Sequence, residues 1–352
     1  MNPELNRPLK ATLSITKTCD LLGCVHCYSD CTREADKKEL TKEQWCNLID
    51  AMIDDGVIQL FIEGGEPLHR SDFMQIVRHA SKRLMLVLRT WGHLVTPEIA
   101  AEWSRLRVGT AIVDIHGARA ETHDGIVGVP GTFERSVAGV KNLVAAGVRV
   151  YMTLILHRRN YREVQDYLHL AHSLGAEKVG ILRLYPMGRA KRRWTELALS
   201  LDEMMETINS LEVPSGLKLM QSWHPNDGNT CYQMAAVSAF GNSIGCPYLG
   251  EYLNYGNVLE IPFIETWKHP LWKRLRSGHV KQPCDDCYAT QGSDGGCRAT
   301  AYAFTGDWDA ADPFCAVSNR GVDLRVLPER LFQEEPRSEH PSHTGMANNN
   351  RV

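Results

Sequence analysis

The sequence predicts an α/β fold in which a partial (β/α)6 barrel is followed by a small, irregular, cysteine-rich domain. Residues 10–215 alternate six short apolar runs with amphipathic stretches, the pattern of a parallel sheet with helical crossovers. After residue 214 the pattern changes to short runs rich in glycine and cysteine. The 11 cysteines form two groups, with none between Cys46 and Cys231. The barrel is therefore expected to separate two ligand sites.

The expected strands are apolar runs bounded by polar or glycine-containing segments, at Ala11–Ile15, Ile58–Ile62, Leu84–Leu88, Thr110–Asp114, Val150–Ile155 and Lys178–Leu184. Helical periodicity between them is clearest at Lys42–Asp55, Thr132–Ala146 and Tyr161–Leu174. Gly147 and Gly175 follow two of these helices and act as stop signals. Right-handed crossovers turn six such units into an open barrel. Its active site is expected at the carboxyl ends of the strands.

Three regions follow from these patterns. Residues 1–215 form the expected barrel, residues 216–325 the cysteine-rich domain, and residues 326–352 a polar tail that is expected to be disordered.

Composition excludes several classes of protein. The net charge is −3, and nucleic-acid binding would require a basic excess to neutralise phosphates. No apolar run approaches the ~18 residues of a membrane span. The segment Met1–Leu5 lacks the basic and apolar regions of a secretory signal, so a cytoplasmic location is expected. In that reducing compartment, clustered cysteines more often serve metal or redox chemistry than disulfides.

Three cysteines lie close together after the first strand, at Cys19, Cys24 and Cys27. Cysteine thiolates are the usual ligands of iron–sulfur clusters, and three of them can hold three irons of a [4Fe–4S] cluster. The fourth iron would then be free to bind a small ligand. The alternative is a zinc knuckle that combines Cys27 with Cys31.

The segment Glu63-Gly64-Gly65-Glu66-Pro67 ends the second expected strand. Its glycines permit a ligand to approach the backbone closely, and Glu66 can accept a hydrogen bond from an ammonium group. The alternative is an ordinary strand–helix turn, because glycine pairs are common in turns.

Together, the cysteine triplet and this segment resemble the radical S-adenosylmethionine (SAM) superfamily. The family spacing is Cys-x3-Cys-x2-Cys, and this chain has one extra residue, which a tight turn at Gly23 can absorb. The resemblance implies a partial TIM barrel and a [4Fe–4S] cluster on the triplet. It also implies that SAM is held by Gly64, Gly65, Glu66 and Pro67.

Further segments extend the resemblance to SAM-binding positions. Asp114 and His116 end the fourth strand, where relatives place polar groups near the ribose. Arg183 ends the sixth strand, where relatives use an arginine near the SAM carboxylate. Tyr28 follows the third cysteine and is expected beside the adenine. The alternatives are structural: Arg183 could pair within the barrel, and Tyr28 could belong to the core.

The C-terminal cysteines resemble the SPASM domain, which usually carries seven cysteines for two auxiliary clusters. Ser293 stands where a seventh cysteine is expected. Asp294 is the preferred substitute, because a carboxylate is ionised at neutral pH and an alcohol is not. Loss of the second cluster, as in a twitch-type domain, and a structural zinc ribbon are the alternatives. The implied ligands are Cys231, Cys246, Cys284, Cys287, Asp294, Cys297 and Cys315.

The resemblance implies reductive cleavage of SAM to a 5′-deoxyadenosyl radical that abstracts hydrogen from the substrate, with electrons from a donor such as flavodoxin or ferredoxin. Cationic side chains at the expected strand ends, among them Arg183 and Arg189, favour a polar and even anionic small molecule. The leading hypothesis is a sugar, aminoglycoside or nucleoside precursor that undergoes decarboxylation, dehydrogenation or epimerisation. Glu63 and Cys31 are catalytic candidates, and Cys31 is either a hydrogen-atom donor or an inert thiol.

Three alternative functions remain open at this stage. A peptide maturase is disfavoured, because only about ten residues precede the first strand read from periodicity, and many maturases carry a peptide-recognition domain there. A porphyrin-modifying enzyme also fits the motif set. A zinc-ribbon binding module requires the Gly-Gly-Glu-Pro match to be accidental.

Overall fold

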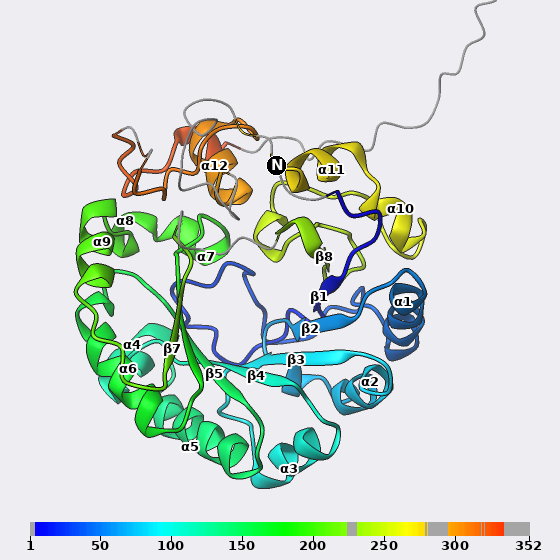
Figure 1. The fold of residues 1–352 in the computed structure, drawn as a ribbon, viewed down its shortest axis with the longest axis horizontal. Helices are drawn as coiled ribbons and strands as arrows, with labels where there is room; N and C mark the ends of the chain where they lie inside the picture. Colours follow the sequence, from blue (N-terminus) through cyan, green and yellow to red (C-terminus); the bar gives the residue numbers. More distant parts are fainter. Residues whose placement is uncertain are drawn as a thin grey trace, which may run out of the picture.

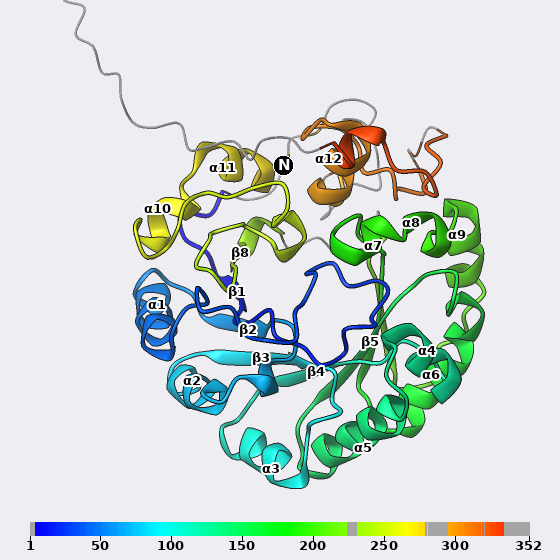
Figure 2. The ribbon, with the colours of Figure 1, turned by 180° about the vertical axis from the view of Figure 1, so that it is seen from behind.

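The computed structural model describes residues 4–223, 231–278, 280, 295–317, 319 and 321–333. Within these ranges the chain forms one unclosed parallel sheet of eight strands in the order β7-β6-β5-β4-β3-β2-β1-β8. Figures 1 and 2 show that the helices cover the outer, convex side of this curved sheet. The predicted partial barrel is confirmed.

Six strands correspond to the runs expected from the sequence, with ends that differ by at most two residues. They are β1 Lys10–Ser14, β2 Gln59–Glu63, β3 Met85–Thr90, β4 Thr110–Asp114, β5 Val150–Ile155 and β6 Lys178–Leu182. Each pairs in parallel with the next along the chain. Because all six run in the same direction, the loops that follow them meet at one edge of the barrel.

Two further strands were not expected in the barrel. Strand β7, Lys218–Gln221, pairs with β6, and strand β8, Met234–Val237, pairs with β1. Both lie beyond residue 215, so the region predicted as a separate domain supplies both edge strands. The edges of a six-stranded open barrel would expose unpaired backbone N–H and C=O groups, and these strands satisfy them.

The outer layer consists of the helices α1 Lys42–Asp54, α2 Phe73–Ala80, α3 Pro97–Arg105, α4 Ala120–Val127, α5 Thr132–Ala145 and α6 Val164–Ser173. Helix α1 begins at a capping box in which the Thr41 side chain accepts from the backbone of Gln44. The predicted helix Tyr161–Leu174 is in fact a short 3-10 turn, η2 Tyr161–Glu163, followed by α6.

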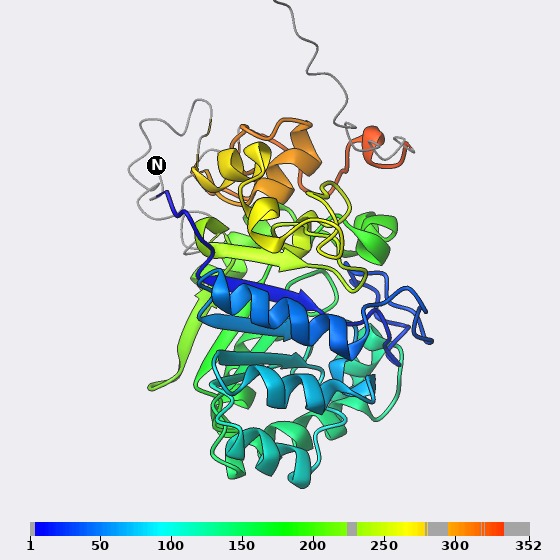
Figure 3. The same cartoon turned by 90° about the vertical axis from the view of Figure 1, so that its right-hand side faces the viewer.

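The rest of the described chain packs on the barrel through short elements. These are η1 Pro67–His69, α7 Gly188–Arg192, α8 Trp194–Leu197, α9 Leu201–Asn209, η3 Cys231–Gln233, η4 Pro247–Leu249, α10 Phe263–Trp267, α11 Pro270–Arg276, α12 Arg298–Thr305 and η6 Glu329–Leu331. Figure 3 shows α10 and α11 (yellow) beyond strand β8, and Figure 1 shows that α12 (orange) lies on the other side, above α7 and α8. In the described part of the chain, no helix is both long and apolar enough to cross a membrane.

The start of the predicted disordered tail is packed. Leu327 is buried, and the Arg330 guanidinium lies over the Tyr302 ring, 5.2 Å from its centroid. The indole N–H of Trp194 donates to the Leu324 carbonyl at 2.7 Å. The start of the expected tail therefore packs on the folded chain, and its remainder, 334–352, lies outside the described residues.

Candidate cofactor and substrate site

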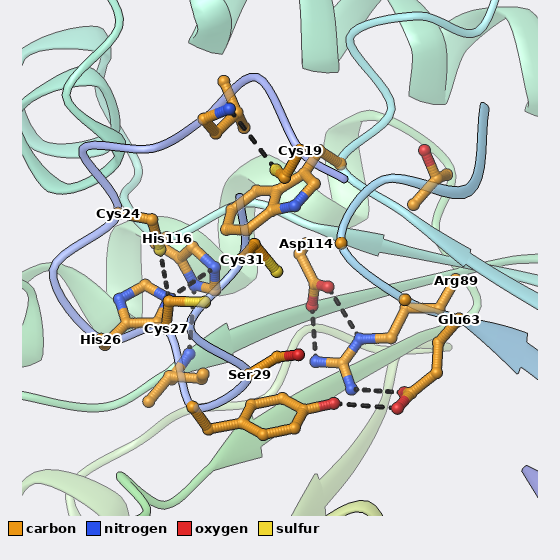
Figure 4. A pocket seen from close by; sticks show the side chains of 17 residues that line it. Cys19, Cys24, His26, Cys27, Ser29, Cys31, Glu63, Arg89, Asp114 and His116 are labelled. Atoms are coloured by element: carbon orange, nitrogen blue, oxygen red, sulfur yellow. Dashed lines mark hydrogen bonds and ion pairs between the residues drawn. The ribbon is translucent and has the colours of Figure 1, made fainter. Parts of the chain in front are cut away.

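The three cysteines of the N-terminal triplet line one cavity at the carboxyl ends of β1 to β4, together with Cys31 (Figure 4). Two backbone hydrogen bonds hold their loop: Cys19 N–H donates to the Thr32 carbonyl at 2.8 Å, and Thr32 N–H donates to the Lys17 carbonyl at 2.9 Å. A hydrogen bond with the Cys31 thiol lowers the pKa of Cys27 to about 6. Burial raises the pKa of Cys19 and Cys24 instead, so within the triplet Cys27 is the thiol that ionises most readily.

The donor set fits an iron–sulfur cluster. Its members are free thiols around one cavity, and thiolates are the ligands such clusters take. Among the described residues, no three thiol sulfurs lie within 4.8 Å of one another. A tetrahedral zinc site with Zn–S bonds of ~2.3 Å would need sulfurs about 4 Å apart. The Cys27 and Cys31 thiols are close enough to hydrogen-bond, but among the described residues no third thiol joins this pair at zinc spacing.

The glycine pair, Gly64 and Gly65, forms one wall of the cavity. Neither position has room for a side chain. A Cβ on Gly64 would lie 2.6 Å from the Thr16 carbonyl oxygen, and one on Gly65 would overlap the Thr18 carbonyl. Glu66 lies behind this wall and is fully buried. Its carboxylate accepts from the Thr90 hydroxyl and the Trp91 N–H, both at 2.8 Å. Pro67 is the first residue of η1.

A charged network forms the floor of the cavity (Figure 4). The Arg89 guanidinium donates to Asp114 at 2.7 and 3.0 Å and lies 3.6 Å from Glu63. The Tyr28 hydroxyl donates to Glu63 at 2.8 Å. Behind Tyr28, the Tyr248 ring makes an edge-to-face contact at 5.0 Å between centroids. One guanidinium thus faces two carboxylates, which leaves the floor with one excess negative charge.

Two histidines stand beside the thiols. Nε2 of His26 lies 3.5 Å from the Cys24 sulfur and 3.1 Å from Nε2 of His116. Nδ1 of His116 accepts from the Ile155 N–H at 3.2 Å, so the His116 proton is assigned to Nε2, which donates to His26. Burial lowers the pKa of both imidazoles well below the usual range. Both rings are therefore neutral at physiological pH.

Comparison with known proteins places this geometry in a family. Residues 13–171 match the radical SAM superfamily. The AdoMet-dependent heme synthase of Methanosarcina barkeri is 30% identical over 341 residues, which cover 88% of this chain and 97% of the relative. The chain belongs to the radical SAM superfamily. It is an enzyme of that family, whose cofactors are a [4Fe–4S] cluster and SAM.

Other relatives span most of this radical SAM chain. The mycofactocin maturase of Mycobacterium tuberculosis is 29% identical over 357 residues, which cover 96% of this chain and 89% of the relative. The crystal structure of Streptococcus suis SuiB bound to S-adenosylmethionine superposes with a TM-score of 0.71 at 17% identity, over 89% of this chain and 78% of SuiB. The structural likeness concerns the fold.

Arg183 does not line the cavity in this radical SAM enzyme. Its guanidinium lies 2.5 Å from Asp312, and both side chains are fully buried. It also donates to the Thr300 hydroxyl at 3.2 Å and lies over the Phe314 ring. This geometry does not support the expected contact with the SAM carboxylate, because the guanidinium is engaged by Asp312. The alternative for Arg183 was an ion pair within the barrel. Arg183 does form a buried ion pair, but its partner comes from the C-terminal region.

The expected auxiliary ligands are only partly within the described residues. Cys246 precedes η4, Cys297 precedes α12, and Cys315 is buried beside the loop of Asp312. Cys231 begins η3, and its side chain is not described. Cys284, Cys287 and Asp294 lie outside the described residues, as does Ser293. The auxiliary ligand set therefore stays a prediction.

Sequence reasoning missed two residues of the cavity floor and its surroundings. Arg89 is a charged residue near the end of β3, directly after its apolar run, a signal that could have marked it as functional. Tyr248 reaches the network from η4, a region that sequence reasoning treated as separate from the barrel. Nothing in the local sequence around Tyr248 indicates that contact.

Replacing Gly65 by Ala is expected to weaken SAM binding at least about tenfold, because overpacking against backbone costs ~1–3 kcal/mol and displaces the wall of the cavity. Equilibrium dialysis of SAM against the reconstituted enzyme measures this. Gly125→Ala is the matched control, because its Cβ would meet no atom within 4 Å. That variant is expected to bind SAM normally, and equal SAM affinity in both variants would contradict the prediction.

The enzyme is expected to lose stability as the pH falls from about 6.5 to 4. Burial lowers the pKa of His123 to about 4 and that of His157 to about 3. In the unfolded chain both histidines have the ordinary pKa of about 6.5, so they bind protons at a higher pH than in the folded chain. Each unit of pKa difference can lower the free energy of unfolding by roughly 1.4 kcal/mol. Thermal midpoints at pH 7 and pH 5 should therefore differ less in His123→Gln and His157→Gln than in the wild type. Exposed His169→Gln should keep the full difference.

Proposed function

We propose that this radical SAM enzyme is a maturase that modifies a peptide substrate. The observation that carries the proposal is the charge of the cavity floor. Arg89 is the one cation among the described lining residues, and Asp114 and Glu63 already engage it. A peptide presents neutral amides and aromatic or cationic side chains, which suit such a floor. Trp91, which also lines the cavity, offers a ring surface to an aromatic side chain.

The relatives support the same substrate class. Besides the mycofactocin maturase, the PqqA peptide cyclase of Gluconobacter oxydans is 25% identical over 353 residues, which cover 93% of this chain. These names favour the peptide alternative over the sugar-type substrate that the sequence first suggested. The sugar-type hypothesis rested on cationic side chains at the strand ends. These are partly neutralised, because Arg183 pairs with Asp312 and Lys191 with Glu251.

A tetrapyrrole is the second candidate, because the heme synthase is 30% identical to this chain. Heme-type tetrapyrroles carry acidic side chains, which bind best to arginines or lysines that are free to pair with them. The described cavity floor has an excess negative charge instead. The floor therefore favours the peptide.

When bound, the cluster and SAM supply the one-electron chemistry of the family. Cys19, Cys24 and Cys27 are the proposed cluster ligands. The wall at Gly64 and Gly65 lets SAM lie against the backbone. Arg89 and Glu63 orient a polar group of the substrate. The electron donor is proposed to be a flavodoxin or ferredoxin.

The auxiliary clusters predicted from the C-terminal cysteines are part of the same proposal. The described candidates are Cys246, Cys297 and Cys315. Two auxiliary clusters would raise the iron content of the enzyme to about twelve atoms per chain, and one would give about eight.

The test compares two kinds of substrate with anaerobically reconstituted, reduced enzyme and SAM. One reaction contains a synthetic library of linear peptides rich in aromatic residues, and the other an iron porphyrin with propionate side chains. Peptide-dependent formation of 5′-deoxyadenosine, with a mass change in a peptide, is the expected result. Turnover of the porphyrin with none of the peptides would overturn the proposal.

A matched variant tests the charge argument directly. Glu63→Gln removes the excess negative charge of the floor but keeps a group that can accept from Tyr28. Turnover of peptides that carry a cationic side chain should fall more than turnover of their neutral counterparts. An equal loss of turnover for both kinds of peptide would show that the charge of Glu63 does not select the substrate.

A further inference from the structure

Three side chains with metal-binding atoms converge outside the cavity of the cysteines. Nε2 of His69 lies 2.9 Å from the Asp20 carboxylate, and Nε2 of His93 lies 2.9 Å from the same carboxylate. The three ligating atoms all lie within 4.8 Å of one another. None of the three residues lines the cysteine cavity. They form a separate cluster, although Asp20 directly follows the cavity residue Cys19 in the chain.

The barrel brings this cluster together from three loops. Asp20 follows β1 in the cysteine loop, His69 ends η1 after β2, and His93 follows β3. Neighbouring parallel strands bring these loops to the same edge of the sheet. The residues are 24 or more positions apart along the chain, so their convergence is a product of the fold.

The exposure of the cluster suits an ion that enters from solvent. The His93 side chain is 0% exposed, while those of His69 and Asp20 are 31% and 35% exposed. One ligand is therefore fixed by packing, and the other two border solvent. A metal bound here would keep open positions for water on the solvent side.

We propose that Asp20, His69 and His93 bind one divalent transition-metal ion. Two imidazoles and one carboxylate are a common ligand set for zinc and for non-heme iron. The ion would replace the two His–Asp hydrogen bonds and would compensate the carboxylate charge with both imidazoles neutral. It would also tie the cysteine loop to the loops after β2 and β3. The proposal is independent of the substrate of the enzyme.

The second ring nitrogen of His93 affects how tightly a metal ion is expected to bind. Nδ1 of His93 is buried and has no hydrogen-bond partner among the described residues. Metal-binding histidines usually donate this second N–H to a partner, and its loss typically costs about 10–100-fold in affinity. The ion is therefore expected to bind more weakly than a structural zinc.

The test uses anaerobically reconstituted holoenzyme, titrated with Zn²⁺ against a chromophoric chelator. His69→Ala removes the more accessible of the two histidines in the cluster. His79→Ala is the matched control, because Nε2 of His79 lies 3.0 Å from Asp50 and its side chain is 30% exposed, yet no third ligand converges there. Wild type and His79→Ala should bind one more equivalent of zinc than His69→Ala, whose affinity should fall at least about 100-fold.

Iron and sulfide measurements on the same samples separate this site from the cluster, because all three proteins should hold equal amounts of both. X-ray absorption at the zinc edge should show nitrogen and oxygen neighbours at ~2.0–2.1 Å. Identical zinc titrations of wild type and His69→Ala would overturn the proposal. So would sulfur neighbours at ~2.3 Å, which would place the zinc on thiols. In both cases the three residues would be a metal-free hydrogen-bonded clamp.

Discussion

Replacing Asp312 by Asn is expected to destabilise the folded enzyme by about 3–5 kcal/mol, because it leaves the Arg183 guanidinium buried without its counter-charge. The two side chains are 1% and 0% exposed and lie 2.5 Å apart. Asp312 also accepts from the Cys297 N–H at 2.8 Å and from the Thr300 hydroxyl at 2.8 Å. The carboxylate thus joins the end of β6 to the start of α12. Its loss should loosen the C-terminal cysteine region from the barrel.

The thermal midpoint of the reconstituted enzyme measures this effect. Asp323→Asn is the matched control, because its carboxylate also pairs with an arginine, Arg325, at 2.9 Å but on the surface. Exposed ion pairs contribute about 0–1 kcal/mol, so the control should change little. Similar thermal midpoints for the two variants would show that the buried Arg183–Asp312 pair stabilises the enzyme no more than an exposed ion pair does.

The barrel could be predicted from sequence because each of its six central strands is a local apolar run followed by a helical pattern. Strands β7 and β8 could not, because each has four residues and is defined by its partner across the chain. Their pairing with β6 and β1 is non-local, and periodicity carries no information about such contacts. The predicted boundary at residue 215 followed the change of sequence pattern. It therefore left both edge strands, β7 and β8, outside the region predicted as the barrel.

The site divides in the same way. The cysteine triplet and the glycine pair are contiguous motifs, and the structure places both around one cavity. The partner of Arg183 could not be read from its neighbourhood, since Asp312 lies 129 residues further along the chain. The cluster of Asp20, His69 and His93 is likewise a product of three loops. Local sequence identifies groups that can do chemistry, and only the fold shows which of them meet.

Replacing Cys24 by Ala is expected to remove the cluster of the N-terminal loop and with it all cleavage of SAM, because the remaining triplet offers two thiolates for three irons. Iron and sulfide content, the visible absorbance of the cluster and the yield of 5′-deoxyadenosine with dithionite measure the loss. Cys46→Ala is the matched control, because Cys46 lies in α1 and does not line the cavity. That variant should retain its iron and its activity.

The unusual spacing of the triplet makes Cys31 the decisive second position. Cys31 lines the same cavity and hydrogen-bonds to Cys27, so it is placed to replace a missing ligand. Retention of iron and SAM cleavage by Cys24→Ala would contradict the assignment of Cys24. If both were then lost in the double variant Cys24→Ala/Cys31→Ala, the third ligand would be Cys31. Loss in Cys24→Ala with retention in Cys31→Ala leaves the ligand set at Cys19, Cys24 and Cys27, and the extra residue is then absorbed within the loop at Gly23.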